Sequence, residues 1–172
     1  VGAIAKFHFD ATAFGKMYKG RHRAQRYTET SDNGKRISTK KMIYKNGVPT
    51  LTYSEPRKDY WVRPLEQKGT VDPMTAIMAL LADQPKDASC QLAMDIFDGA
   101  RKFSIKLIEK NTSDGKLSCK GTYTKIAGYS KKEWAQGKGF PFELKYILKY
   151  DIYRVDRLVM STSRGRTSFI RR

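Results

Sequence analysis

The residue types that perform catalysis are few in this sequence, and none stands in a known catalytic pattern. Its two histidines, His8 and His22, both lie in the N-terminal quarter, and no GxSxG segment marks a nucleophile that they could serve as a base. No glycine-rich phosphate loop of the GxxxxGK(S/T) or GxGxxG form occurs, so nucleotide use has no support. The sequence therefore predicts a protein that is not an enzyme and uses no cofactor.

The carboxylates and the metal-ligand types lead to the same expectation. The candidate carboxylates alternate with basic residues and turns, a pattern that does not favour general acid–base catalysis by a carboxylate pair; they are Asp95, Asp98, Glu109 and Asp114. A zinc site needs about four ligands, and the cysteines and histidines show no CxxC or HxxxH spacing. We expect no metal site.

The two cysteines, Cys90 and Cys119, allow two interpretations. Cys90 begins the segment CQLAMDIF, and Cys119 lies on the second of two further expected strands, so neighbouring or next-but-one strands can bring the sulfurs together. A bridge would stabilise the fold by roughly 3.5 kcal/mol in the chain-entropy model. Two buried free thiols in a cytosolic protein are the alternative.

Positive charge is the strongest compositional feature. Lys and Arg number 34 against 17 Asp and Glu, which gives a net charge of +17 and favours an anionic partner. In the basic stretch 16–26, an extended strand would place Lys19, Arg21 and Arg23 on one face. This stripe is either a solvated face that protects a sheet edge or an anion-binding site for lipid phosphate or glycan carboxylate. Nucleic acid, anionic membrane surfaces and acidic envelope polymers all match the charge.

The segment GTVDPMTAIMALLAD, residues 69–83, predicts one short helix over residues 72–83. Asp72 suits the N-cap and Pro73 the first turn. Helical spacing places four apolar residues on one stripe, with Ala76 and Ala79 roughly opposite; the stripe consists of Met74, Ile77, Met78 and Leu81. The stripe either fills the core of a curved sheet or borders an apolar ligand cavity, with Trp61 at the cavity mouth.

Strands must position all of these residues, because alternation of apolar and polar residues dominates the chain. Turn signals recur at 32–34, 46–47, 98–99 and 114–115, which is typical of a β-meander. We expect strands near residues 3–13, 17–31, 35–45, 48–54, 57–62, 90–97, 100–109, 116–126, 142–151, 153–162 and 166–171, with a long loop over 128–141. The length of 172 residues suits a single domain, residues 1–172.

Four segments in order resemble a known family. DPMTAIMALL, CQLAMDIFDGARKFSIKL, LSCKGTYTKIAGY and DRLVMSTSRGRTSFI are similar to the signature blocks of the proteobacterial envelope proteins catalogued as domain of unknown function 3108. The similarity covers most of residues 40–172. It departs at Ala100, where the family has a second arginine, and at Phe103, where it has a tyrosine.

The resemblance implies a location and a shape. It implies a periplasmic protein that is exported by a signal peptide. Residues 1–5 form no charged and then apolar leader, so we expect either that a signal peptide was removed or that the start was trimmed. The resemblance also implies a curved antiparallel sheet or incomplete β-barrel wrapped around the helix, similar to the lipoprotein-localisation factors, which carry acyl chains in an apolar hollow. On this basis Cys90 and Cys119 are bridged, as in the family. The family has no established activity.

Three functional hypotheses follow. The first is a non-enzymatic cell-envelope protein whose hollow, bordered by the helix stripe, binds a hydrophobic or lipid-like ligand. The second is a basic nucleic-acid-binding β-barrel, which requires a cytosolic location and free thiols. The third is a structural module that binds proteins through exposed sheet edges. We favour the first. The sequence does not indicate which oligomeric state the protein adopts.

Overall fold

The structure is a computed structural model that describes residues 8–53, 56–87, 90–162 and 165–171. Its strands are β1 (His8–Tyr18), β2 (Arg21–Asp32), β3 (Ile37–Lys45), β4 (Val48–Tyr53), β5 (Gln84–Pro85), β6 (Ala93–Phe97), β7 (Lys102–Ser113), β8 (Lys116–Ala127), β9 (Gly139–Lys149), β10 (Ile152–Thr162) and β11 (Gly165–Ile170). Its helices are the 3₁₀ turn η1 (Pro64–Glu66), α1 (Pro73–Leu80) and α2 (Lys131–Trp134).

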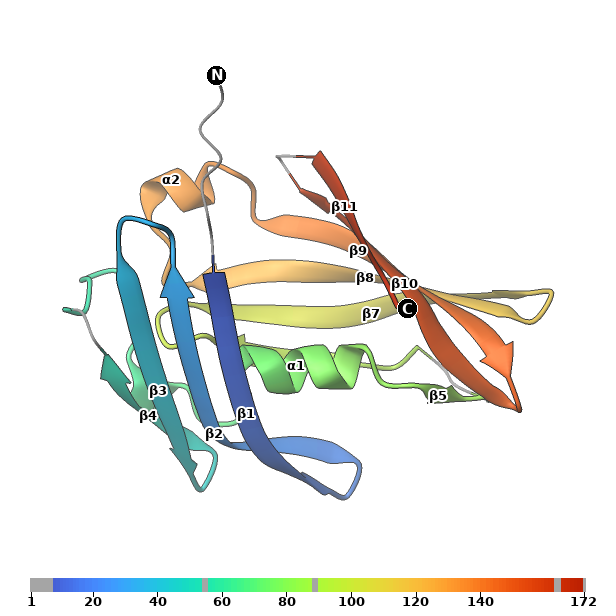
Figure 1. Ribbon diagram of the computed structural model, residues 1–172, viewed down its shortest axis with the longest axis horizontal. Helices are drawn as coiled ribbons and strands as arrows, with labels where there is room; N and C mark the ends of the chain where they lie inside the picture. Colours follow the sequence, from blue (N-terminus) through green and yellow to red (C-terminus); the bar gives the residue numbers. More distant parts are fainter. Residues whose placement is uncertain (1–7, 54–55, 88–89, 163–164, 172) are drawn as a thin grey trace.

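The strands form two antiparallel sheets that largely follow chain order. The first has the order β1-β2-β3-β4, and the second runs β11-β10-β9-β8-β7-β6, with β5 paired to β10. Figure 1 shows the first sheet on the left and the second on the right, curled into a half-barrel with α1 between them. The predicted fold class, a mainly β protein with a curved antiparallel sheet around one short helix, is confirmed.

A short extended segment, residues 69–71, connects the two sheets and places α1. The Gly69 N–H donates to the Gly47 carbonyl in the β3–β4 turn (2.9 Å). The Val71 N–H donates to the Asp95 carbonyl (3.0 Å), and the Val71 carbonyl accepts from Phe97 N–H (2.9 Å). Because α1 begins two residues later, its start is fixed at the junction of the sheets.

Helix α1 begins as its sequence predicts. The fully buried Asp72 accepts hydrogen bonds from the backbone N–H of Thr75 (2.9 Å) and from its hydroxyl (2.6 Å). Pro73 occupies the first turn, where a missing N–H costs nothing. The helix ends at Leu80, earlier than the predicted residue 83, because the chain turns there into β5, which pairs with β10.

One cluster of buried apolar side chains joins both sheets and the helix. Tyr27 and Met42 come from the first sheet, Leu117 and Leu144 from the second, and Ala76 from α1. The small alanine side chain lets the helix backbone approach the strands closely. The packing of α1 is therefore shared between both halves of the molecule.

The predicted strand 17–31 is wrong at its start. A two-residue turn at Lys19 (φ 48°) and Gly20 (φ 70°) separates β1 from β2. Such tight hairpin turns need positive φ at both central residues, which Asn-Gly and Asp-Gly supply most easily, so Lys-Gly is a weaker signal. β1 consequently continues to Tyr18, with a bulge between Phe14 and Gly15. The predicted residues 3–7 lie outside the described residues.

Two further segments differ from the prediction. Residues 57–62 form no strand, since the Trp61 N–H bonds back to the Lys58 carbonyl (3.1 Å) in a turn. The expected loop 128–141 contains α2, and β9 already begins at Gly139. A capping box explains α2, because Ser130 and Glu133 each bond the other's backbone N–H.

Candidate functional site

A disulfide joins Cys90, just before β6, to Cys119 on β8. The Cα atoms are 5.5 Å apart, both residues are buried, and their sequence separation is 29. The order β6-β7-β8 shows that the bridge crosses one intervening strand. The predicted bridge is confirmed, and the interpretation as free thiols is wrong.

Helix α1 turns its alanine side, not its larger apolar stripe, toward the core. Thr75, Ala76, Ala79 and Leu80 are the buried residues of the helix. In the opposite stripe, Met78 is 62% exposed, Ile77 43% and Leu81 37%; Met74 is half-buried against the core. The stripe is therefore open on the concave side of the half-barrel.

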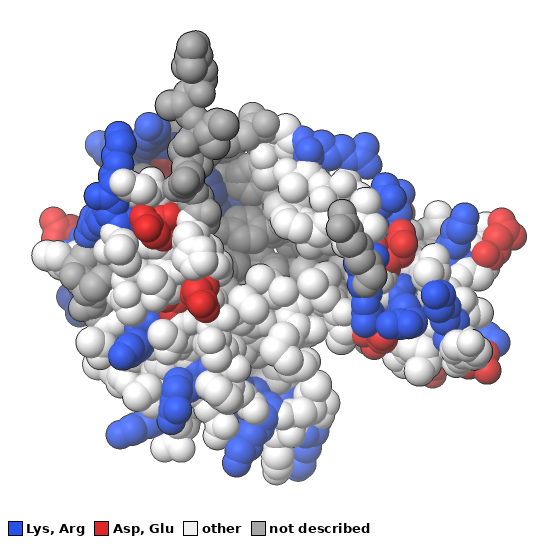
Figure 2. Space-filling view, in the orientation of Figure 1, with Lys and Arg blue, Asp and Glu red and all other residues white. Residues whose placement is uncertain are grey.

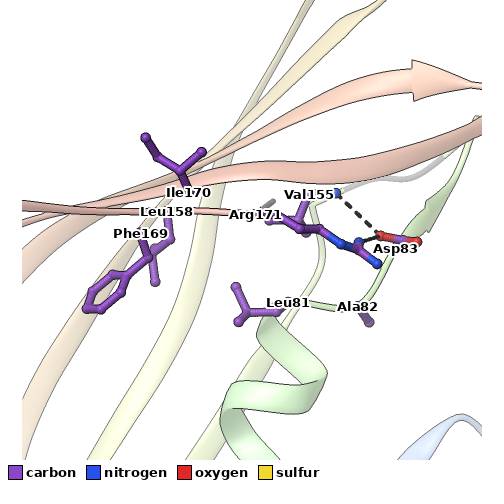
Figure 3. A pocket seen from close by; sticks show the side chains of 8 residues that line it. All are labelled: Leu81, Ala82, Asp83, Val155, Leu158, Phe169, Ile170 and Arg171. Atoms are coloured by element: carbon purple, nitrogen blue, oxygen red, sulfur yellow. Dashed lines mark hydrogen bonds and ion pairs between the residues drawn. The ribbon is translucent and has the colours of Figure 1, made fainter.

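A pocket of about 480 Å³ lies beside Leu81 at the end of α1. Its walls are Leu81, Ala82, Asp83, Val155, Leu158, Phe169, Ile170 and Arg171 (Figure 3). We call it the Leu81 pocket. It is mostly apolar, but Arg171 and Asp83 form an ion pair in its wall (2.6 Å), and Asp83 also accepts from the Val155 N–H (3.4 Å). The position of this charged pair would place a ligand's polar end there and its apolar part against Leu81.

A second pocket, of about 410 Å³, lies between α1 and the β1–β2 hairpin. Its walls are Ala13, Phe14, Gly15, Lys16, Met17, His22, Arg23, Thr75 and Met78. We call it the Met78 pocket. Gly15 permits close strand packing here, since a Cβ at that position would lie 2.6 Å from the Arg23 carbonyl oxygen. Met78 and Leu81 are one helical turn apart, so the two pockets meet the same stripe.

We call the exposed stripe with its two pockets the apolar groove. Of the predicted cavity residues, Met78 and Leu81 line the pockets and Ile77 is exposed on the same stripe. Met74 packs partly into the core. Trp61 lines neither pocket, because it is buried in the loop before η1, where its carbonyl accepts from Arg57 and its ring lies near Lys58.

The sequence interpretation missed the wall that β10 and β11 supply. Phe169 and Ile170 lie almost ninety residues beyond α1, and no local pattern links the two segments. The sequence did hold one signal, the two adjacent apolar residues Phe169 and Ile170 on an expected strand. Neighbouring side chains on a strand point to opposite faces of the sheet, and an antiparallel sheet often has one exposed face, so an exposed apolar side chain could be expected here. Both side chains are in fact exposed, Phe169 by 61% and Ile170 by 56%.

The predicted cationic stripe forms the tip of a hairpin rather than one strand face. Lys19 lies in the turn, while Arg21 and Arg23 share a face of β2. The Arg23 guanidinium carbon is 4.5 Å from the Tyr18 ring centroid, and Lys19 Nζ is 5.5 Å from it. Lys19 and Arg23 therefore gather around one exposed aromatic ring, and Arg21 lies opposite Tyr18 on the neighbouring strand.

A separate polar cluster holds α2 against the β6–β7 turn. Arg101 donates to Glu133 from Nε (2.9 Å) and from a terminal nitrogen (2.6 Å), and it also pairs with Asp98 (3.3 Å). Burial alone would raise the pKa of Glu133, but hydrogen bonds from Ser130 and the charge of Arg101 outweigh it and hold that pKa below its usual value. With its carboxylates satisfied internally, this cluster has a structural role.

Two further features are absent from the described part of the chain. No three His, Cys, Asp or Glu side chains gather there where a metal ion could bind. No described helix has the length and apolarity needed to cross a bilayer. No protein-family model, no curated protein and no solved structure matches this chain.

Proposed function

We propose that this protein is a non-enzymatic periplasmic protein of the cell envelope that binds a hydrophobic or lipid-like ligand in the apolar groove. The observation that carries this proposal is the orientation of α1, whose alanines face the core while Ile77, Met78 and Leu81 face the concave opening. Large apolar side chains that meet in an exposed concave surface commonly mark a binding site. A ligand that covers them would remove their apolar surface from water, and this burial would stabilise the complex.

The dimensions and chemistry of the groove support a small amphiphile. Pockets of about 480 and 410 Å³ are within the roughly 300–1,000 Å³ typical of small-molecule sites. Their walls combine aliphatic and aromatic side chains with a few charged groups, Arg171 near one end and Arg23 near the other. Such a site accepts a hydrocarbon chain with a polar or anionic head.

The disulfide supports the proposed compartment. Disulfides persist in oxidising compartments such as the periplasm and are rare in the cytosol. The resemblance of four segments to the envelope family points the same way. The nucleic-acid hypothesis needs free thiols in the cytosol, so the Cys90–Cys119 bridge weighs against it.

Replacement of Leu81 by Asp tests the groove. We expect Leu81→Asp to weaken binding of the fluorescent fatty acid 11-(dansylamino)undecanoic acid by about tenfold or more, because a carboxylate in the apolar wall must lose its water. The matched control is Leu65→Asp, which adds the same charge at an exposed leucine of η1. Fluorescence titration measures both affinities.

The outcomes separate clearly. Weakening confined to Leu81→Asp supports the groove, and equal weakening by Leu65→Asp contradicts it. Mass spectrometry of organic extracts from protein purified out of its native envelope then identifies the ligand. A stoichiometric lipid or hydrophobic molecule in the extract supports the proposal. A clean extract together with no binding of the fatty acid would refute it.

A further inference from the structure

The β1–β2 hairpin carries a concentrated positive charge. Residues 11–28 contain no Asp or Glu, and they carry Lys16, Lys19, Arg21, Arg23 and Arg26. All five side chains are exposed. The hairpin extends beyond α1 at the bottom of Figure 1, and Figure 2 shows Lys and Arg without Asp or Glu along that lower border.

These cations lack carboxylate partners within the described residues. Some lysines elsewhere on the surface are compensated, such as Lys86 by Asp151 and Lys120 by Glu109 (2.9 and 2.8 Å). In contrast, the described contacts of Lys19 and Arg23 are with the Tyr18 ring. The hairpin tip is thus an uncompensated cationic end of the molecule, suited to an anionic surface.

Large apolar side chains are exposed at the same tip. Phe14 is 59% exposed, Met17 60% and Tyr18 51%. Strand alternation and the pairs Tyr18↔Arg21 and Met17↔His22 place Tyr18 on the cationic face and Met17 on the opposite face. Apolar side chains therefore flank the cations on both sides of the hairpin.

We propose that the tip of the β1–β2 hairpin docks end-on onto an anionic lipid bilayer. Lys and Arg side chains at an interface bind lipid phosphates while Met, Phe and Tyr side chains enter the headgroup region. A bilayer surrounds an inserted tip and contacts both faces, whereas a nucleic acid bound to the cationic face would leave Met17 in water. The Met78 pocket shares Phe14 and Met17 with the tip, so docking brings this pocket to the lipid.

Vesicle flotation with charge-reversed variants tests the docking. The double variant Arg21→Glu and Arg23→Glu should bind mixed phosphatidylglycerol–phosphatidylcholine vesicles at least about tenfold more weakly, because each cation near an anionic surface contributes about fivefold. The matched control, Lys131→Glu and Lys132→Glu, makes the same charge change at two exposed residues of α2 and should lose much less. Equal losses in both variants would overturn the proposal.

Tryptophan fluorescence tests insertion at the tip. Met17→Trp should show a blue-shifted emission component that brominated phosphatidylglycerol quenches, beyond any change in the wild type. Emission from this variant that stays unshifted and unquenched on bound vesicles would overturn insertion. Tighter binding of single-stranded DNA than of the anionic vesicles at equal salt, lost in the Arg21 and Arg23 variant, would assign the tip to nucleic acid and also overturn the proposal.

Docking does not depend on a ligand in the groove. Leu81→Asp should float with anionic vesicles as the wild type does, since Leu81 belongs to the other pocket. If fatty-acid binding fails while the hairpin variants still lose vesicle binding, the groove proposal is wrong and the docking surface stands. If the fatty acid binds in the groove but the hairpin variants keep their vesicle binding, the docking proposal alone is wrong.

Discussion

At the scale of single residues, the polar groups of this protein are mainly used for structure. Glu133 shows this most clearly, because it accepts from the Ser130 N–H (2.8 Å) and hydroxyl (2.7 Å) and from Arg101. These partners favour the ionised carboxylate, and the lowered pKa of Glu133 records that preference. Its charge therefore stabilises the attachment of α2 to the β6–β7 turn.

Glu133→Gln should lower the free energy of unfolding by about 1 kcal/mol at neutral pH. Because the folded pKa of Glu133 is lowered, its contribution is complete above the unfolded value of about 4.3 and disappears as the pH falls through the folded value. Urea unfolding of both proteins from neutral to acidic pH should show their difference shrinking below about pH 5. The control Glu66→Gln alters an exposed carboxylate on η1 and should change little. A wild-type advantage that stays constant down to acidic pH would contradict this role.

At the scale of elements, local signals predicted the regular strands and the start of α1 well. Asp72-Pro73 located the N-terminus of the helix, and Asn46-Gly47 and Asp114-Gly115 located two hairpins. The Lys19-Gly20 turn was missed because lysine is an uncommon residue at positive φ. The capping box of Ser130 and Glu133 is recognisable in the sequence, but it lies in a long segment with several glycines, which predicted a loop instead.

The orientation of α1 could not be predicted from its own sequence. Apolar stripes are usually buried, and the stripe of Met78 and Leu81 predicted either a core filler or a cavity wall. Which side of α1 faces the core depends on the distance between the helix and the sheet. The segment 69–71 fixes that distance through its hydrogen bonds to Gly47 and Asp95. At that close distance the alanine side is the one that packs. The wall of Phe169 and Ile170 likewise depends on long-range pairing, because β11 pairs with β10 and β10 pairs with β5 just after α1.

The disulfide belongs to this same scale, because it ties the segment before β6 to β8. Replacing both Cys90 and Cys119 by Ala should lower the free energy of unfolding by about 3.5 kcal/mol, the chain entropy restored to a loop of this length. Urea unfolding measures the change. The reduced wild type serves as a second test, since a reductant should shift its midpoint and leave that of the double variant unchanged. A reductant that shifts neither protein would contradict a stabilising bridge.

At the scale of the whole molecule, the two sheets are expected to unfold as one unit. They share the buried cluster that includes Tyr27 on β2 and Leu144 on β9, and residues 69–71 bond to both sheets. Helix α1 packs against β1, β2 and β6, so separating the sheets would expose it. A shared core and a shared helix give neither sheet an independent way to bury its concave face.

Leu144→Ala tests this cooperativity. Leu144 is fully buried, and its truncation should cost about 2–5 kcal/mol through lost burial and a residual cavity. Native-state hydrogen exchange should then show protection falling by a similar amount at the slowest amides of β2 and β3 as well as of β8 and β9. Ile108→Ala, at a side chain 61% exposed on β7, should change protection little in either sheet. If Leu144→Ala reduces protection only in the second sheet, the sheets are separate folding units and the open groove between them is a mobile junction; uniform loss means that the groove is held open by a single rigid core.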